Sequence, residues 1–353
     1  MDIDTKVAPI WVLLGAKHGD NQQLLAIAHA LKTPFRVVSL RFNLAASLPP
    51  VLLGTHRLSW RSDMPLVPPW PQAVLAAGRK SVPAARWIRR QSGGTTRLIH
   101  VNRPWAPLSW FDLIVTTPQY ALPARQNVLC NLMPFVAPPT DTTPTASFVQ
   151  QAAALPRPWT VVLVGGNSRP FVLDDAAAQR LATVVNAQVR DAGGSAWVLD
   201  SPRTPGATMS FIEQTLEVPS HAVRWRDGDN LYGTLLALGD RLIVTSDSAS
   251  MLSEALLTGK PVQLFDLPVR PDLRWRMTSA WAAAAAQTPA SMTARSFEVM
   301  RDVGMLSSVR DLALLHRALK DAQLLDGDGR ALEQVERERR ATLARIAQLL
   351  QPR

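Results

Sequence analysis

Short apolar runs alternate with helical stretches along most of the chain. Ile10 to Leu14 is an uninterrupted apolar run, which indicates a buried strand, and Gln22 to Leu31 follows with apolar residues at helical spacing. Phe35 to Leu40 is predicted as the next strand. This alternation favours a parallel sheet, because each helix returns the chain to begin the next strand in the same direction.

Two more strands of this first sheet are predicted at Leu98 to Val101 and Leu113 to Thr116, whereas Pro49 to Gly94 is rich in Pro, Trp and Arg and is expected to be the least regular part. Its side chains allow two interpretations. Tryptophan favours the headgroup level of a membrane and arginine pairs with anionic lipid; nucleic acid would accept the same surface. Alternatively, the aromatic rings fill the space beneath a loop while the arginines stay in water.

Pro134 to Pro144 contains several prolines and threonines and is the expected connection between two domains, 1–155 and 156–353. After it the alternation restarts. The predicted strands are 159–164, 195–200, 241–245 and 261–265, and the predicted helices lie near 174–191, 208–217, 231–238 and 248–258. Residues 331–350 carry apolar side chains at helical spacing in a charged segment, which predicts an amphipathic terminal helix that must pack on another part of the protein.

Composition narrows the class of protein. The 353 residues suffice for two domains, and 47% hydrophobic content with 19% charge is typical of a packed globular chain. The net charge of +10 favours anionic partners such as phosphates, nucleotides, nucleic acid or acidic headgroups. Cys130, the single cysteine, is predicted to be a buried, inert thiol in a reducing compartment.

The expected location is cytoplasmic, with at most peripheral contact with an anionic inner membrane surface. The acidic start of the chain, Met1 to Lys6, has the wrong charge order for a secretory signal. No stretch reaches the roughly 18 uninterrupted apolar residues of a membrane-spanning helix.

The richest polar turn follows the predicted strand 241–245. It carries Ser246, Asp247, Ser248 and Ser250, with Met251 beside them. Their oxygens can cap the next helix, where free backbone N–H groups and the helix dipole favour a phosphate. Glu254, one to two turns deeper, could accept hydrogen bonds from both hydroxyls of a ribose. A capped, solvated helix in an ordinary strand–helix unit explains the serines equally well.

A second candidate loop is Gly165, Gly166, Asn167 and Arg169, after a strongly apolar strand. Its glycines allow close backbone approach, and Arg169 could neutralise a phosphate. The alternative is a plain tight turn. The loop lacks the Lys-Ser/Thr ending of a P-loop and the spacing of a dinucleotide fingerprint, so neither of those nucleotide sites is supported.

In the first half, His18 and Asp20 lie in the loop expected at the carboxyl end of the first strand, where α/β sheets bind ligands. Both are candidate general bases. The ordinary interpretation makes His18 an exposed loop residue and Asp20 or Asn21 a helix cap. The six histidines have no ligand spacing, so no metal site is expected.

Several motifs together resemble those of the elongated-mitochondria (mitochondrial fission) family, over most of the chain. They are Gly15 to Gln22, Thr116 to Tyr120 with Asn127-Val128, Gly165-Gly166, and Thr245 to Val262. That family is similar to GT-B glycosyltransferases in the segment Asp247 to Pro261. The resemblance implies an α/β fold of two Rossmann-like domains facing across a cleft, with the terminal helix 331–350 packing back on the N-terminal domain.

By the same resemblance, Ser248 to Met251 would face the diphosphate of a nucleotide sugar, Glu254 its ribose, and the Gly165 loop the cleft side of the diphosphate. The leading hypothesis is metal-independent sugar transfer from a nucleotide-diphosphate sugar, with no other cofactor, to an unknown acceptor, lipid-linked or from the cell envelope. Arg169 and the helix dipole would stabilise the leaving group, and His18 or Asp20 would deprotonate the acceptor.

The competing hypothesis is a non-catalytic adaptor that binds a membrane or a protein. Plant relatives are linked to recruiting a dynamin-like division protein to mitochondria, which does not demand catalysis. Nucleic acid is the less expected partner, and the oligomeric state stays open.

Overall fold

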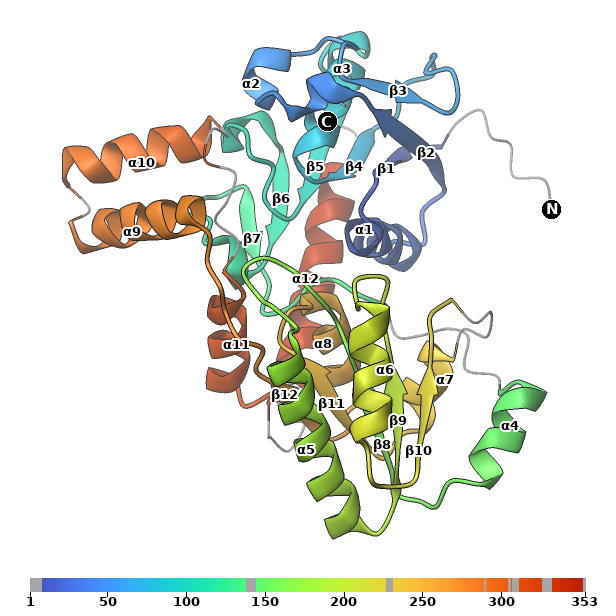
Figure 1. The fold of residues 1–353 in the computed structure, drawn as a ribbon. Coiled ribbons are helices and arrows are strands. Elements are labelled where there is room, and N and C mark those ends of the chain that lie inside the picture. The colour runs from blue at the N-terminus through green and yellow to red at the C-terminus, as the bar shows by residue number, and fades with distance from the viewer. Residues whose placement is uncertain are drawn as a thin grey trace. The chain divides into compact units, whose positions relative to one another are not determined.

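The computed structural model describes residues 8–137, 144–226, 231–288, 290–303, 306, 311–325 and 332–351 (Figure 1). Grouped by their contacts, the residues form two compact units. Unit 1 comprises Met1–Val136, Arg274–Leu315 and Val335–Arg353, and unit 2 comprises Ala137–Leu273 and His316–Gln334. The units are therefore built from interleaved segments, whereas the sequence analysis placed one boundary near residue 155.

Unit 1 contains a seven-stranded sheet in the order β3-β2-β1-β4-β5-β6-β7, in which all neighbours are parallel except β2 and β3. The strands are β1 (Ile10–Leu14), β2 (Phe35–Phe42), β3 (Trp60–Ser62), β4 (Ala73–Ala77), β5 (Arg97–Val101), β6 (Leu113–Thr116) and β7 (Val128–Cys130). Helices of this unit are α1 (His18–Ala30), α2 (Pro50–Leu53), α3 (Val82–Gln91), α9 (Leu273–Gln287) and α10 (Met292–Asp302). Two further helices, α11 (Leu312–Asp321) and α12 (Leu332–Leu349), each have residues in both units.

The expectation that Pro49 to Gly94 is irregular was wrong. This segment contains β3, β4 and α3, and β4 lies in the middle of the sheet between β1 and β5. Its apolar run Ala73–Ala77 is buried, as a central parallel strand requires, and Gly78 ends it with a φ of 74°. In α3, Arg90 is exposed and Arg86 and Arg89 are partly exposed, while Ile88 and Ala85 pack inward.

The tryptophans of the same segment pack in the protein interior. Trp60 is buried, and the ring centroids of Trp60 and Trp87, Trp70 and Trp87, and Trp11 and Trp70 lie 5.7, 5.9 and 5.8 Å apart. These separations are typical of favourable aromatic pairs. For these rings, the interpretation as core residues therefore holds.

The end of α12 belongs to the core of unit 1. Ile346 is fully buried in one apolar cluster with residues of β1 and α1, and Leu343 packs against it. Thr342 accepts a hydrogen bond from Asn131 Nδ2 at 2.9 Å, and the backbone N–H of Leu132 donates to Glu338 at 2.6 Å. These contacts explain why the last residues of the chain group with its first 136.

Cys130 was predicted to be buried, and this is wrong: its side chain is exposed. It is the last residue of β7, which is an edge strand. Apolar neighbours in the sequence do not ensure burial there, because an edge strand has a partner on one side only.

Unit 2 contains five parallel strands in the order β10-β9-β8-β11-β12. They are β8 (Trp159–Leu163), β9 (Ser195–Leu199), β10 (Ser220–Val223), β11 (Arg241–Thr245) and β12 (Val262–Phe265), with helices α4 (Ala146–Ala153), α5 (Asp175–Ala192), α6 (Gly206–Thr215), α7 (Tyr232–Leu238) and α8 (Ala249–Leu256). The predicted fold class, α/β with two Rossmann-like sheets, is confirmed. None of the helices in the described parts of the chain combines the length and apolar character that a bilayer crossing demands.

Candidate functional site

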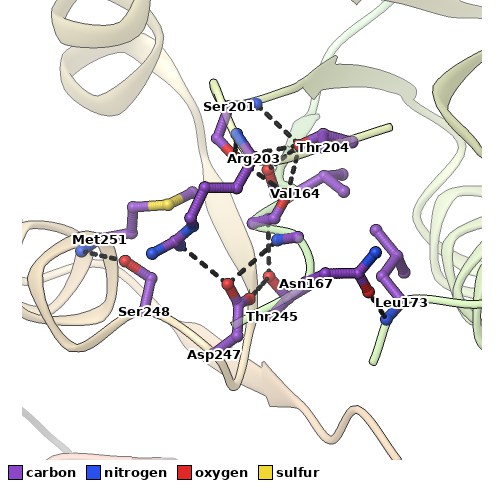
Figure 2. Close-up of polar contacts among 12 residues, drawn as sticks. Val164, Asn167, Leu173, Ser201, Arg203, Thr204, Thr245, Asp247, Ser248 and Met251 are labelled. Carbon is purple, nitrogen blue, oxygen red and sulfur yellow. Dashed lines mark hydrogen bonds and ion pairs between the residues drawn. The ribbon is translucent and has the colours of Figure 1, made fainter. Parts of the chain in front are cut away.

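The candidate site lies where the strand order of unit 2 reverses. β8 and β11 are neighbours in the middle of the sheet, and the chain continues from them in opposite directions, to β9 and to β12. Parallel strands present their carboxyl ends at one edge, and ligands of such sheets bind at this reversal. The loop of Gly165 and the loop of Asp247, which the resemblance assigned to the same diphosphate, are thereby brought together (Figure 2).

Asp247 joins these loops from within. Its carboxylate is fully buried; Oδ2 accepts hydrogen bonds from the Gly166 N–H at 3.0 Å and from Arg203 Nη2 at 2.8 Å. Oδ1 accepts from Thr245 Oγ1 at 2.7 Å, and Thr245 Oγ1 accepts from the Gly165 N–H at 2.8 Å. The side chain of Asp247 thus contacts donors on the loops after β8 and β9 and at the end of β11, and it organises the site.

The two glycines are required by this close packing. A Cβ on Gly165 would lie 2.0 Å from Asp247 Oδ1, and one on Gly166 would lie 2.2 Å from the carbonyl oxygen of Arg203. Both separations are far below van der Waals contact. The glycines therefore let the β8 loop approach the Asp247 carboxylate and the loop after β9.

Arg203 is the charged residue that the sequence analysis missed. It lies in the loop after β9, and its side chain is 41% exposed, so part of the guanidinium faces solvent while Nη2 contacts Asp247. Ser201 Oγ donates to the Gly165 carbonyl at 2.9 Å, and Thr204 Oγ1 donates to the Val164 carbonyl at 3.0 Å, which fixes the loop (Figure 2). The available signal was a polar run directly after a buried strand.

The serines at the start of α8 have different positions. Ser246 is buried and accepts from the Leu267 N–H at 3.0 Å, so it joins the turn to the chain after β12. Ser248 is the N-cap of α8 and accepts from the Met251 N–H at 3.5 Å (Figure 2). Ser250 and Met251 lie in the first turn and are partly exposed. The first-turn N–H groups of a helix have no partner within the helix, which makes this end suited to an anion.

Glu254 lies further along α8, partly buried, and accepts a hydrogen bond from the hydroxyl of Tyr232 on α7. Burial raises the pKa of Glu254, and the hydrogen bond from Tyr232 opposes that shift. The pKa of Tyr232 is raised well above its ordinary value, first by burial and then by the charge of Glu254. The Tyr232 hydroxyl bonds to one carboxylate oxygen of Glu254, Oε2, and does not use the other.

Asn167 and Arg169 lie at the edge of the Gly165 loop. Asn167 is exposed, and its Oδ1 accepts from the Leu173 N–H at 2.9 Å, which shapes the loop (Figure 2). The side chain of Arg169 is 91% exposed and lies 3.4 Å from the carboxylate of Asp272. Among the two arginines, Arg203 is the one that contacts Asp247.

In unit 1, His18 and Asp20 lie in the first turn of α1, which begins four residues earlier than predicted. His18 is exposed, whereas Asp20 Oδ1 accepts from Asn102 Nδ2 at 3.1 Å. Neither Asp20 nor Asn21 caps the helix: Asn21 exchanges two hydrogen bonds of 2.9 Å with the backbone of Gly15. Asp20 therefore lies at the carboxyl edge of the first sheet, between the ends of β1 and β5.

The motif Thr116 to Tyr120 ends β6 at the same edge of the first sheet. The hydroxyls of Thr116 and Thr117 and the Oε1 of Gln119 are buried and have no hydrogen-bond partner among the residues that the structure describes. Unpaired buried polar atoms are uncommon in folded proteins. The carboxyl edge of the unit 1 sheet thus carries buried polar side chains at and after the end of β6 in addition to Asp20.

The fold and the polar network at the strand reversal define a two-unit α/β protein of the Rossmann-like class. The chain belongs to the family described as mitochondrial fission ELM1, whose profile matches residues 18–303, and this confirms the resemblance. Uncharacterized protein RP120 of Rickettsia prowazekii (strain Madrid E) is 24% identical over 298 residues, 73% of this chain and 83% of that protein. Mitochondrial fission protein ELM1 of Arabidopsis thaliana is 29% identical over 240 residues, 60% of this chain and 54% of that protein.

Three solved structures illustrate a similar course of the backbone. A UDP-glucosyltransferase from Polygonum tinctorium is 10% identical, with 99% of this chain and 100% of that chain covered and a TM-score of 0.48. MnaA of S. aureus with UDP is 11% identical, with 88% and 94% covered and a TM-score of 0.45. MurG of Acinetobacter baumannii is 12% identical, with 96% and 99% covered and a TM-score of 0.42.

Proposed function

We propose that unit 2 binds the nucleotide of a nucleotide-diphosphate sugar and that the protein transfers the sugar to an acceptor bound by unit 1. The observation that carries this proposal is the network at the β8–β11 reversal, where a capped helix start, a half-exposed arginine and a carboxylate one to two turns further along the helix occur together. We also propose that the protein is cytoplasmic.

The diphosphate would bind at the start of α8. The backbone N–H group of Ser250 in the first turn and the positive end of the helix dipole favour an anion there. Arg203 supplies the neighbouring positive charge, because its exposed part remains available while Nη2 neutralises Asp247. Arg169 would reach the diphosphate only after leaving Asp272.

The ribose would bind at Glu254. Tyr232 holds the carboxylate through one oxygen, so the other can accept a hydrogen bond from a ribose hydroxyl. Hydrogen bonds to a carboxylate favour its ionised form and so lower its pKa. Ribose binding would therefore oppose the effect of burial on Glu254 and reduce the cost of a buried charge.

For the chemical step, Asp20 is the better placed of the two proposed bases, because Asn102 orients its carboxylate. It would accept the proton of an acceptor hydroxyl, whose oxygen bonds to the anomeric carbon as the bond from that carbon to the diphosphate breaks. The helix dipole and Arg203 would stabilise the leaving diphosphate, so that the step needs no metal. His18, exposed in the same turn, is the alternative base.

Isothermal titration of the full chain with UDP, GDP, ADP and CMP tests the nucleotide site. We expect one nucleoside diphosphate to bind and Glu254→Ala to weaken it by about tenfold, the loss of one hydrogen bond to a charged group. Glu217→Ala is the matched control, because Glu217 is exposed and pairs with Arg190 on the surface. Equal affinity of both variants contradicts the assignment of Glu254 to the ribose.

A non-catalytic adaptor is the second candidate function. It is favoured by the observation that Asp247 packs against the two glycines inside the protein, while buried Ser246 bonds to the Leu267 N–H. These residues would be needed to fold unit 2 even if it binds no nucleotide. The absence of heat of binding for all four nucleotides would support the adaptor.

A further inference from the structure

The positive charge of the protein is concentrated in one stretch of unit 1. Residues 21–136 contain 13 lysines and arginines and only two acidic residues, an excess of 11 positive charges against a net charge of +10 for the whole chain. Both acids have protein partners: Asp112 pairs with Arg89 and Arg97, and Asp63 accepts from the Ser39 N–H at 3.0 Å. Unit 1 thus offers anions a strongly basic surface.

Arginines of α3 line a hollow on this surface. The hollow, about 370 Å³, is lined by Arg86, Arg89, Arg90, Thr55, Ser109, Trp110, Gly94 and Leu98. The guanidinium of Arg86 lies 3.5 Å from the centre of the Trp110 ring, and Arg90 Nη1 lies 3.1 Å from Thr55 Oγ1. Burial and the charge of Arg89 lower the pKa of Arg86, a strain that a bound anion would relieve.

Four leucines between residues 44 and 58 of unit 1 are exposed. Leu44, Leu48, Leu52 and Leu58 are 93%, 49%, 70% and 70% exposed. The first three are spaced by four residues through the 3-10 helix η1 (Leu44–Ser47) and α2, while Ala46 and Leu53 face inward. A single exposed leucine is ordinary. Four within 15 residues indicate a surface that a membrane or another molecule covers.

The leucines and the arginines belong to one part of unit 1. α2 lies beside α3 and contacts it (Figure 1). The Thr55–Arg90 hydrogen bond joins the second residue after α2 to the end of α3. Arg57, between two of the leucines, is exposed and lies 4.9 Å from the ring centres of both Trp60 and Trp87. Apolar and cationic side chains are thus adjacent.

We propose that this leucine–arginine face, formed by Leu44, Leu48, Leu52 and Leu58 with Arg57, Arg86 and Arg90, docks on an anionic lipid bilayer. The leucines enter the boundary between headgroups and acyl chains, and the arginines pair with lipid phosphates. A soluble polyanion such as nucleic acid would use the arginines but gains nothing from exposed leucines. The anchors are leucines, since Trp60 is buried and Trp87 is packed against it.

Vesicle co-sedimentation of the full chain tests this face. We expect binding to phosphatidylcholine vesicles that contain about 30 mol% phosphatidylglycerol, and binding at least about tenfold weaker to phosphatidylcholine alone. The double variant Leu44→Gln/Leu52→Gln and the double variant Arg57→Gln/Arg90→Gln should each weaken binding to the anionic vesicles by about tenfold or more. All four side chains are exposed, so circular dichroism should show both variants folded.

The matched controls are Leu273→Gln and Arg241→Gln, which change exposed residues of the same types elsewhere in the chain and should leave vesicle binding unchanged. Heparin chromatography distinguishes binding to a lipid bilayer from binding to a soluble polyanion. The leucine variant should elute from heparin at the same salt concentration as the unaltered protein. Protein that stays in the supernatant with anionic vesicles overturns the proposal. Full vesicle binding by the leucine variant also overturns it, because the face would then bind polyanions by charge alone.

Discussion

Asp247 provides the sharpest test of how unit 2 is built. Replacing it by alanine removes a fully buried carboxylate that accepts hydrogen bonds from Gly166, Thr245 and Arg203. The Gly166 N–H is buried and would lose its partner. Thr245 Oγ1 already lies 3.5 Å from the Leu163 carbonyl and can turn toward it. The guanidinium of Arg203 is 41% exposed and can be hydrated.

The magnitude follows from these three donors. Removing one partner of a buried ion pair typically costs about 3–5 kcal/mol, and an unsatisfied buried donor costs about 1–3 kcal/mol. The exposure of Arg203 and the second acceptor for Thr245 favour the lower end, so we expect a loss of about 3 kcal/mol in the free energy of unfolding. For a unit of this size the loss corresponds to a fall in Tm of about 6–12 °C.

The assay is thermal and urea unfolding followed by circular dichroism and tryptophan fluorescence, to which the buried Trp159 and Trp197 of unit 2 contribute. Glu217→Ala is the control: it breaks a surface ion pair with Arg190 and should change stability by about 1 kcal/mol or less. If Asp247→Ala is as stable as Glu217→Ala, the carboxylate does not hold the three loops together and the reasoning is refuted.

Four further outcomes follow from the structure. Gly166→Ala should destabilise unit 2 by about 1–3 kcal/mol in the same melts, because its Cβ meets the Arg203 carbonyl, whereas Gly206→Ala, with open space around its Cβ, should not. Burial lowers the pKa of His100 to about 3, so the unfolded chain alone takes up a proton below pH 6.5; stability should fall by about 2 kcal/mol between pH 6.5 and 5, and His100→Leu should abolish that fall. Because burial raises the pKa of Glu254, its ionisation costs stability as the pH rises above 4.5; Glu254→Gln should therefore stabilise the protein at pH 7 relative to the unaltered chain, and not at pH 4. Arg203→Ala should weaken the binding of a nucleoside diphosphate, measured by isothermal titration, by about tenfold and that of the nucleoside much less. Where a change is expected, a value equal to that of the unaltered protein contradicts the corresponding structural interpretation.

Much of the fold could be predicted from the sequence, because buried parallel strands such as Trp159–Leu163 are continuous apolar runs between polar turns. β4 was missed although Ala73–Ala77 is also apolar. The prolines and tryptophans around it suggested irregular structure, and only the tertiary packing of Trp60, Trp70 and Trp87 shows that these rings form a core.

The two loops of the candidate site were predictable as well, since each follows a buried strand. Their direct contact depends on β8 and β11 being neighbours, which the order of strands along the chain does not reveal. For the same reason Arg203 was missed, because its loop follows β9. The direction of the Asp247 side chain was equally hidden: it is set by donors from residues 166 and 203, far away in the sequence.

The central claim is that unit 2 binds a nucleoside diphosphate at the start of α8, and a crystal structure of the protein soaked with the diphosphate that titration selects tests it most directly. The account predicts a phosphate oxygen within about 3 Å of the Ser250 N–H group, a contact with Arg203, and a ribose hydroxyl on Glu254. A nucleotide bound elsewhere, with water alone at the start of α8 under saturating conditions, would contradict the account.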